Sequence, residues 1–138
     1  MRYLGLVPAL ALGVLGVPHL YWVGGGQRGL ALALPQRDGR ALFTPAKAGT
    51  LAVALLLFAA ALLVVGAVAD WTAPFPGWVY RRGALAVAVV LLLRALGDFR
   101  LVGFAKRVRG TPFARWDTAL FSPLCAVLGT LILLALRR

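Results

Sequence analysis

Long apolar runs separated by shorter polar stretches are the main pattern along this chain. The first run covers residues 3–22 and has an aromatic residue at each end. A helix rises about 1.5 Å per residue, so a run of this length matches a hydrocarbon core about 30 Å thick. The run therefore predicts a transmembrane helix, and Pro18 near its end predicts a kink.

The start of this run also resembles the charged end of a signal peptide, with Ala31-Leu32-Ala33 as a cleavage motif. The apolar run is longer than the core of a usual signal peptide, and it ends well before that motif. We therefore expect no cleavage and count the run as the first membrane span.

Three further helices follow from the same pattern. Thr44-Pro45 is typical of a helix start, because threonine caps free N–H groups and proline suits the first helical position. The uninterrupted apolar stretch at residues 83–93 would be only about 16 Å long as a helix, so it must continue through polar residues to span. The predicted spans are residues 3–23, 45–69, 80–104 and 117–136.

These spans predict an all-α, polytopic membrane protein, a four-transmembrane-helix up-down bundle in which residues 1–138 form a single integral membrane domain. Composition supports this class, since 62% of the residues are hydrophobic and only 14% are charged. A net charge of +11 would suggest nucleic-acid binding in a soluble protein. Here the basic residues flank apolar runs, so we expect the lipid bilayer and anionic lipid headgroups as partners, and no nucleic acid.

Metal and disulfide chemistry find little support in the sequence. Cys125 is the lone cysteine, which excludes an intramolecular disulfide. Cysteines and histidines do not occur at the spacing of a zinc site, so we expect no metal and no cofactor.

Four spans place both chain termini and the turn at residues 70–82 on one face, and the two longer loops on the other. With Arg94 left out, five basic residues lie on the first face and nine on the second. Because positive charge favours the cytoplasmic side, we expect the long loops in the cytoplasm and both termini outside the bacterial cytoplasmic membrane. Arg2, directly before the first helix, argues for the opposite orientation.

Arg94 and Asp98 are the ionisable residues inside the predicted third span. They are four residues apart, so on one helix they would face the same side and form a charge-assisted pair in direct contact. Two interpretations stay open. The pair neutralises itself so that the helix can lie in lipid, or Asp98 holds Arg94 so that its other donors bind a ligand anion. Arg100 points away from this pair.

Other polar residues also fall where the spans meet the long loops. His19, the only histidine, is either a hydrogen-bonded structural residue or a group that moves a proton. Asp117 is either the N-cap of the fourth helix or part of a site. Ser122, before Pro123, can cap a kinked half-helix whose amide groups suit an anion. We predict six ligand-binding residues: His19, Arg94, Asp98, Asp117, Arg100 and Ser122. We expect four of them, His19, Arg94, Asp98 and Asp117, to approach one another near the long-loop face.

The loop before the fourth helix is basic and aromatic. Lys106, Arg107, Arg109 and Arg115 alternate there with aromatic residues. This pattern is typical of a loop that holds anionic headgroups at a membrane surface.

Several motifs together resemble one known family. They are His19-Leu20-Tyr21-Trp22 with Gly24-Gly25, Leu93 to Arg100 (LRALGDFR) with Gly103 and Lys106, Thr111, Phe113-Ala114, Asp117, and Ser122-Pro123-Leu124-Cys125. Over nearly its whole length the chain resembles the small bacterial four-helix membrane proteins of domain-of-unknown-function family 3995. The resemblance implies the topology and a shared polar end, and it implies no activity.

Three functions remain open. The first is binding of a small anionic or carbonyl-bearing amphiphile at the polar end, with or without catalysis, since no nucleophile-base pair indicates a reaction. The second is a small transporter, which would need a carboxylate in a mid-membrane cavity, and Asp98 is the sole candidate. The third is a structural subunit of a membrane complex or a homo-oligomer, packed through small-residue faces such as Ala9/Gly13 and Ala84/Ala88.

Overall fold

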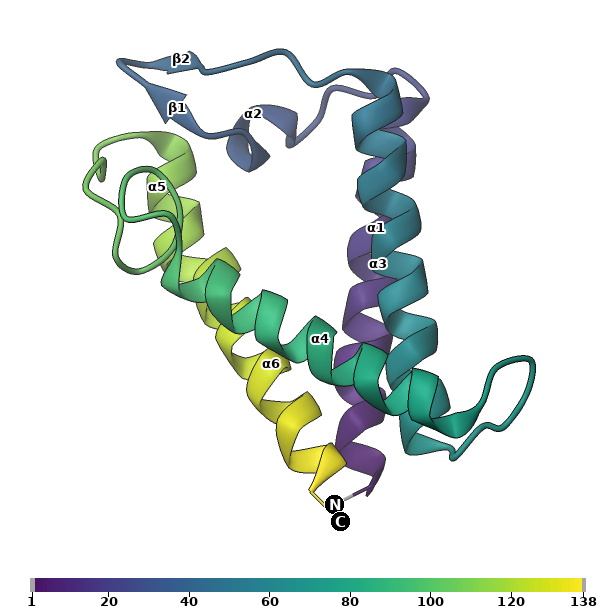
Figure 1. The fold of residues 1–138 in the computed structure, drawn as a ribbon. Helices are drawn as coiled ribbons and strands as arrows, with labels where there is room; N and C mark the ends of the chain where they lie inside the picture. Colours follow the sequence, from purple (N-terminus) through teal and green to yellow (C-terminus); the bar gives the residue numbers. More distant parts are fainter. Residues whose placement is uncertain (1, 138) are drawn as a thin grey trace.

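The computed structural model describes residues 2–137, and its long elements are all helices (Figure 1). In chain order the elements are the 3-10 turn Arg2–Gly5, α1 (Leu6–Val23), α2 (Leu30–Ala33), the strands β1 (Gln36–Arg37) and β2 (Arg40–Ala41), α3 (Lys47–Val68), α4 (Gly77–Leu96), α5 (Pro112–Trp116), the π-helical segment Asp117–Phe121 and α6 (Ser122–Leu136). The two short strands pair antiparallel and form a small hairpin within the first long loop.

Within residues 2–137, three helical stretches are long and apolar enough to cross a membrane: Tyr3–Val23, Lys47–Val68 and Pro112–Leu136. The first two agree closely with the spans that the sequence predicts. The remaining long helix, α4, has 20 residues but is less apolar, because it carries Arg81 and Arg82 near its start and Arg94 in its last turn.

The four long helices lie in two pairs (Figure 1). α1 runs beside α3, α4 runs beside α6, and α3 also contacts α4. The two pairs converge near the turn that joins α3 to α4 and diverge toward α2, the hairpin and α5. At that wider end α2 contacts α5, so the first long loop touches the start of the last helical stretch.

Small residues allow the helices to pack closely. Ala84 and Ala88 of α4 are fully buried. A Cβ atom added at Gly129 of α6 would lie only 3.0 Å from the carbonyl oxygen of Ala88. Small side chains at such crossings let backbones approach each other and gain dispersion contacts. Ala84 and Ala88 are therefore buried within the chain itself, and they do not offer the face for a partner that the sequence suggested.

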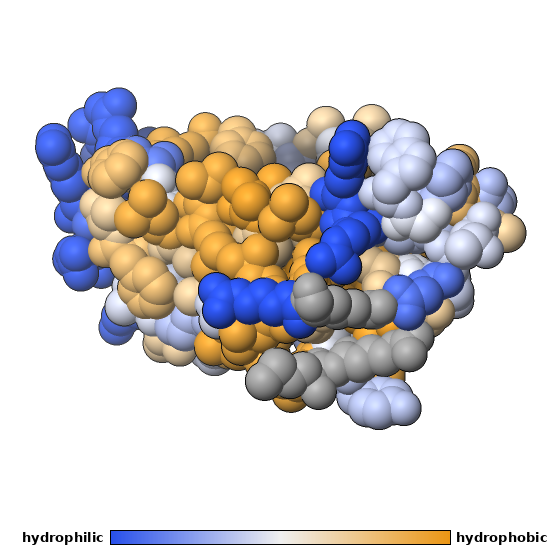
Figure 2. Space-filling view, turned by 60° about the horizontal axis from the view of Figure 1, so that its bottom comes forward, coloured by the Kyte–Doolittle hydropathy of each residue, from blue (hydrophilic) through white to orange (hydrophobic). Residues whose placement is uncertain are grey.

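The outward faces of the helices are apolar. On α1, large apolar side chains such as Leu10, Val14 and Val17 are exposed. Seen from the end where α6 finishes, the surface carries broad apolar areas with hydrophilic side chains at their margins (Figure 2). Apolar side chains directed outward are unfavourable in water and suit hydrocarbon, which agrees with a protein embedded in a membrane.

The third helix differs from its predicted bounds at both ends. The predicted continuation to residue 104 is wrong, because α4 ends at Leu96 and Gly97 follows with a φ of 92°. Phe99 also has a positive φ, 62°, which no helix accommodates. At the other end the helix begins earlier than predicted, at Gly77, and includes Arg81 and Arg82.

The fourth helix begins before its predicted start at residue 117. The hydroxyl oxygen of Thr111 accepts a hydrogen bond from the backbone N–H of Ala114 at 3.1 Å, and Pro112 takes the first helical position. Thr111 is therefore the N-cap. The prediction that Asp117 caps this helix is wrong, because Asp117 lies one and a half turns further along, inside the helical stretch Pro112–Leu136.

Candidate functional site

Asp117 is the centre of the polar end of the molecule. Its side chain is fully buried. One carboxylate oxygen, Oδ1, accepts a hydrogen bond from Nη2 of Arg94 at 2.7 Å. The other, Oδ2, accepts from the backbone N–H of Gly103 at 2.8 Å, from Nζ of Lys106 at 2.9 Å and from Oγ of Ser122 at 3.1 Å. A carboxylate offers about four acceptor positions, so these four hydrogen bonds match the capacity of Asp117.

A π-helical segment presents this carboxylate. The backbone N–H of Ser122 bonds to the carbonyl oxygen of Asp117 five residues earlier, and the hydroxyl of Ser122 bonds to the side chain of the same residue. Such widened turns are uncommon and occur often at functional sites. Here the widening accompanies a helix interior that holds a buried charge.

Lys106 comes to Asp117 from the loop between α4 and α5. Its side chain is fully buried. Besides Asp117, its ammonium group donates to the carbonyl oxygen of Gly103 at 2.9 Å and to the hydroxyl of Thr118 at 2.6 Å. All three ammonium protons are thus used, as a lysine without water requires.

Two glycines make this loop fold possible. Gly97 and Gly103 have φ of 92° and 86°, and their backbones touch. A Cβ atom on Gly97 would overlap the carbonyl of Val102, and one on Gly103 would overlap the backbone of Gly97. The close contact turns the loop back over the end of α4, which lets Lys106 reach inward.

Asp98 holds the same loop from outside. Its Oδ1 atom accepts hydrogen bonds from the backbone N–H groups of Arg100, Leu101 and Val102 at 2.9, 2.7 and 2.9 Å. Burial acts to raise the pKa of the Asp98 carboxyl, but the bonds from the N–H groups of Leu101, Val102 and Arg100 outweigh it and lower that pKa below 3.8. The predicted direct pair of Arg94 with Asp98 is wrong, because Asp98 is an exposed loop residue and Arg94 pairs with Asp117.

Among the three charged side chains that meet at Asp117, Arg94 is the one that reaches the surface, with 33% of its side chain exposed, whereas Lys106 and Asp117 are fully buried. Nη2 bonds to Asp117, while Nη1 is buried and has no hydrogen-bond partner in the described part of the chain. We call Arg94, Lys106 and Asp117 the charged cluster. It contains two cations for one carboxylate, so it carries a net positive charge at the end of apolar helices.

The remaining predicted ligand-binding residues lie elsewhere. His19 lines a separate hollow of about 350 Å³ between α1, α2 and α3, whose lining includes neither Arg94 nor Asp117. Its Nδ1–H donates to the carbonyl oxygen of Leu15 at 2.8 Å. Asp98 and Arg100 line another hollow, of about 690 Å³, together with Arg37 and Arg107. Of the four side chains expected to converge, only Arg94 and Asp117 meet, and His19 and Asp98 lie apart from them. Ser122, which was not part of that expectation, also bonds to Asp117.

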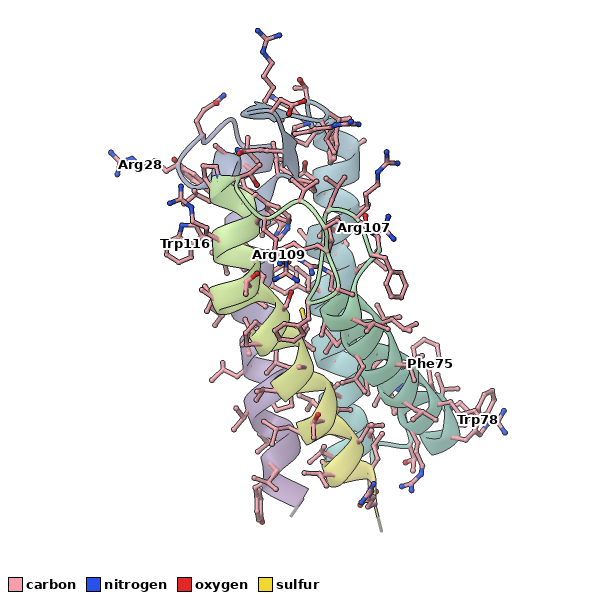
Figure 3. The ribbon with its side chains drawn as sticks, turned by 90° about the vertical axis from the view of Figure 1, so that its left-hand side faces the viewer. Arg28, Phe75, Trp78, Arg107, Arg109 and Trp116 are labelled. Atoms are coloured by element: carbon pink, nitrogen blue, oxygen red, sulfur yellow. The ribbon has the colours of Figure 1, made fainter. Side chains whose placement is uncertain are left out.

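Lys106 is the functional residue that sequence reasoning missed. The sequence assigns it, together with Arg107 and Arg109, to a basic loop that faces headgroups. Arg107 and Arg109 lie in the same half of the molecule as Arg28 and Trp116 (Figure 3). One signal was available, because Lys106 is the only lysine of that loop. A compact ammonium on a flexible stem reaches a buried carboxylate more easily than a planar guanidinium.

The chemistry open to this arrangement is binding of an anion. Within the described residues, no group of three or more His, Cys, Asp or Glu side chains is placed to hold a metal ion. The buried amide, ammonium and hydroxyl donors are already used by Asp117. What remains unmatched is one positive charge and the Nη1 atom of Arg94.

Comparison with known proteins gives the same family as the motifs. The family model described as Protein of unknown function (DUF3995) matches residues 12–132, a range that includes Arg94, Lys106 and Asp117. No curated protein and no solved structure matches the chain. The family match confirms the resemblance seen in the sequence. The chain therefore belongs to the DUF3995 family of membrane-type helical proteins.

Proposed function

We propose that this protein is a four-span membrane protein that binds the anionic group of an amphiphile through Arg94 at its long-loop end. The observation that carries the proposal is the charge balance of the charged cluster. Arg94 and Lys106 share one carboxylate, and the Nη1 atom of Arg94 is buried without a partner. A cation in a place of low dielectric is costly unless it is paired, so this end of the molecule favours a bound anion.

In addition to the three long apolar stretches, α4 provides the remaining span of the four. Its 20 residues correspond to about 30 Å of helix, enough to cross a hydrocarbon core. Arg81 and Arg82 lie in its first two turns and Arg94 in its last, so the charges fall near the two interfaces and the middle is apolar. Contacts with α3 and α6 support its place in an up-down bundle.

An amphiphile fits Arg94 better than a fully soluble anion does. Arg94 stands in the last turn of an apolar helix whose neighbours Val90 and Leu93 are exposed. In a bilayer those residues contact acyl chains, so a ligand that meets the guanidinium from this side has an apolar portion. A carboxylate or phosphate suits the free edge of the guanidinium, because its fork can hold Asp117 and a ligand oxygen together.

Native mass spectrometry of the protein in mild detergent tests this proposal. We expect the wild type to retain an anionic amphiphile such as a fatty acid or phosphatidic acid. Arg94→Lys should weaken that binding about tenfold while largely keeping the fold, because lysine keeps one bond to Asp117 and loses the fork. Arg94→Leu should damage both binding and stability, since Asp117 then loses one partner.

Arg100→Lys is the matched control, because Arg100 is exposed at the same end and does not contact Asp117. Equal binding by the wild type, Arg94→Lys and Arg94→Leu would contradict the proposal, and so would an equal loss in Arg100→Lys. In either case a structural role for the charged cluster would be the better account.

The sidedness of the bundle is part of the same proposal. We place the protein in the bacterial cytoplasmic membrane with the long loops inside, because these loops hold more basic residues than the opposite face. Single cysteines at Arg28 and Gly110 should then label from one side and a cysteine at Phe75 from the other, in a chain whose Cys125 is replaced. Arg28 and Phe75 lie toward opposite ends of the molecule (Figure 3). Labelling of all three from one side would contradict the four-span arrangement.

A further inference from the structure

A basic hollow lies at the end of the molecule opposite the charged cluster, between the start of α4 and the end of α6. It has a volume of about 440 Å³. Its lining combines three arginines, Arg81, Arg82 and Arg137, with Trp78 and with leucines from both helices. Arginine and leucine side chains thus face one space, whereas ordinary interfacial arginines extend singly into the headgroup layer.

Two of these arginines are held in place by the protein. Nη2 of Arg81 donates to the carbonyl oxygen of Leu136 at 2.7 Å, so Arg81 caps the C-terminal end of α6. The guanidinium of Arg82 lies 5.2 Å from the centre of the Trp78 ring, within the range of a cation–π contact. Trp78 itself lies beside Phe75 at this end of α4 (Figure 3). The positive charges therefore stay around the hollow.

Among the described residues that line the hollow, none is an acidic partner for these charges. The residues that line it are basic or uncharged. Asp70, the acidic residue of the preceding turn, lines a different depression with Trp71 and Thr72. Like charges gathered around one space repel one another, and an anion placed between them removes that repulsion.

We propose that this hollow binds an anionic phospholipid of the surrounding bilayer. The headgroup phosphate lies between Arg82 and Arg137, which can each donate two hydrogen bonds to it. One acyl chain lies along Leu85 and Leu133, toward the apolar surface seen at this end of the molecule (Figure 2). This contact with leucines is what selects a lipid over free phosphate, which would meet only the arginines. The site is separate from Arg94 and does not depend on the function proposed for it.

Lipid titration followed by native mass spectrometry tests this site. The test variant is Arg82→Gln/Arg137→Gln, which leaves the α6 cap formed by Arg81 intact. The control variant is Arg28→Gln/Arg40→Gln, which removes the same charge from exposed positions at the other end. The probes are phosphatidylglycerol, phosphatidylcholine and inorganic phosphate.

We expect the wild type and the control to bind phosphatidylglycerol at least about tenfold more tightly than phosphatidylcholine, and the test variant to lose this preference. Inorganic phosphate should compete with phosphatidylglycerol weakly. An equal loss of phosphatidylglycerol binding in both variants would overturn the proposal, because net charge alone would then explain it. Competition by inorganic phosphate at the same concentration as the lipid would overturn the role of the leucines. Arg94→Lys should leave this preference unchanged, so the two sites can fail separately.

Discussion

The long-loop end and the short-turn end of this molecule hold their arginines in different ways. At the long-loop end Arg94 bonds to Asp117, a carboxylate that is fully buried and saturated with donors. At the short-turn end Arg81 bonds to a helix carbonyl, and Arg82 lies over the ring of Trp78. A buried acid thus makes a cation part of the fold. Where the described residues provide no such acid, the cations remain surface groups.

The difference extends to the chain segments at the two ends. At the long-loop end, Lys106 and the N–H of Gly103 tie a whole loop to Asp117, so one carboxylate connects α4, the loop and the helical stretch that follows. At the short-turn end, the turn between α3 and α4 is tied to α4 by a hydrogen bond that the hydroxyl of Tyr80 donates to the carbonyl oxygen of Ala73. Substitutions at the first end should therefore cost much more stability than substitutions at the second.

The largest effect is expected for Asp117→Asn. This change keeps the shape of the side chain but leaves Arg94 and Lys106 without a counter-charge, which should lower the free energy of unfolding by about 4 kcal/mol. Thermal or denaturant unfolding in detergent measures it. Asp38→Asn is the matched control, because the Asp38 side chain is 93% exposed, and it should change stability very little.

A smaller effect is expected for Asp98→Ala. The change removes the acceptor of three backbone N–H groups, and because these lie at the surface, water replaces much of the lost bonding. We expect a loss of about 1 kcal/mol and faster amide hydrogen exchange at Arg100, Leu101 and Val102. Asp98→Asn keeps a carbonyl acceptor and should lose less. A loss as large as that of Asp117→Asn would mean that Asp98 is buried after all.

A smaller effect again is expected for Arg81→Gln at the short-turn end. It removes the charge that caps the last turn of α6, which should lower stability by about 0.5 kcal/mol. Hydrogen exchange of the last turn of α6 reports the change locally. If Arg81→Gln lowers the free energy of unfolding as much as Asp117→Asn does, the contrast between the two ends is wrong.

The smallest effect is the pH dependence contributed by Asp98. Its pKa in the folded protein is lower than the 3.8 of the free side chain, so its contribution is fully present above pH 3.8. The contribution is lost as the pH falls through the lower folded value. Amide exchange of Leu101 and Val102 should therefore rise, beyond its intrinsic dependence on pH, only below about pH 4. In Asp98→Asn this additional rise should be absent.

The membrane helices could be predicted from the sequence because lipid leaves a simple signature. A span must be long and apolar, so residues 3–23 and 45–69 were placed within two residues of Tyr3–Val23 and Lys47–Val68. For α4 the predicted bounds, residues 80–104, were wrong at both ends, because the helix covers Gly77–Leu96. The sequence argument extended the helix forward through Asp98, whereas Gly97 and Asp98 end it and the extra length comes from Gly77 onward.

The partners within the site were harder to predict. Arg94 and Asp98 are close in sequence, which favoured a local pair, but Arg94 bonds to Asp117, 23 residues away. No periodicity links those two positions, because the loop that brings them together depends on two close glycines and on Lys106. The starts of two helices carry the same pattern, a threonine followed by proline, at Thr111-Pro112 and at Thr44-Pro45. At the first of these sites Thr111 is the N-cap, whereas at the second Ala46 is the N-cap residue and α3 begins at Lys47.

A double-mutant cycle between Lys106 and Asp117 tests the charged cluster most directly. Lys106→Met and Asp117→Asn are made singly and together, and the free energy of unfolding of each is measured in the same detergent. Each single change leaves a charge of this pair unmatched, while the double change removes both. The loss of stability in the double variant should therefore be about 2 kcal/mol smaller than the sum of the two single losses. Losses that add to within about 0.5 kcal/mol would show that the two side chains do not interact, and would contradict the buried cluster on which the account of the long-loop end rests.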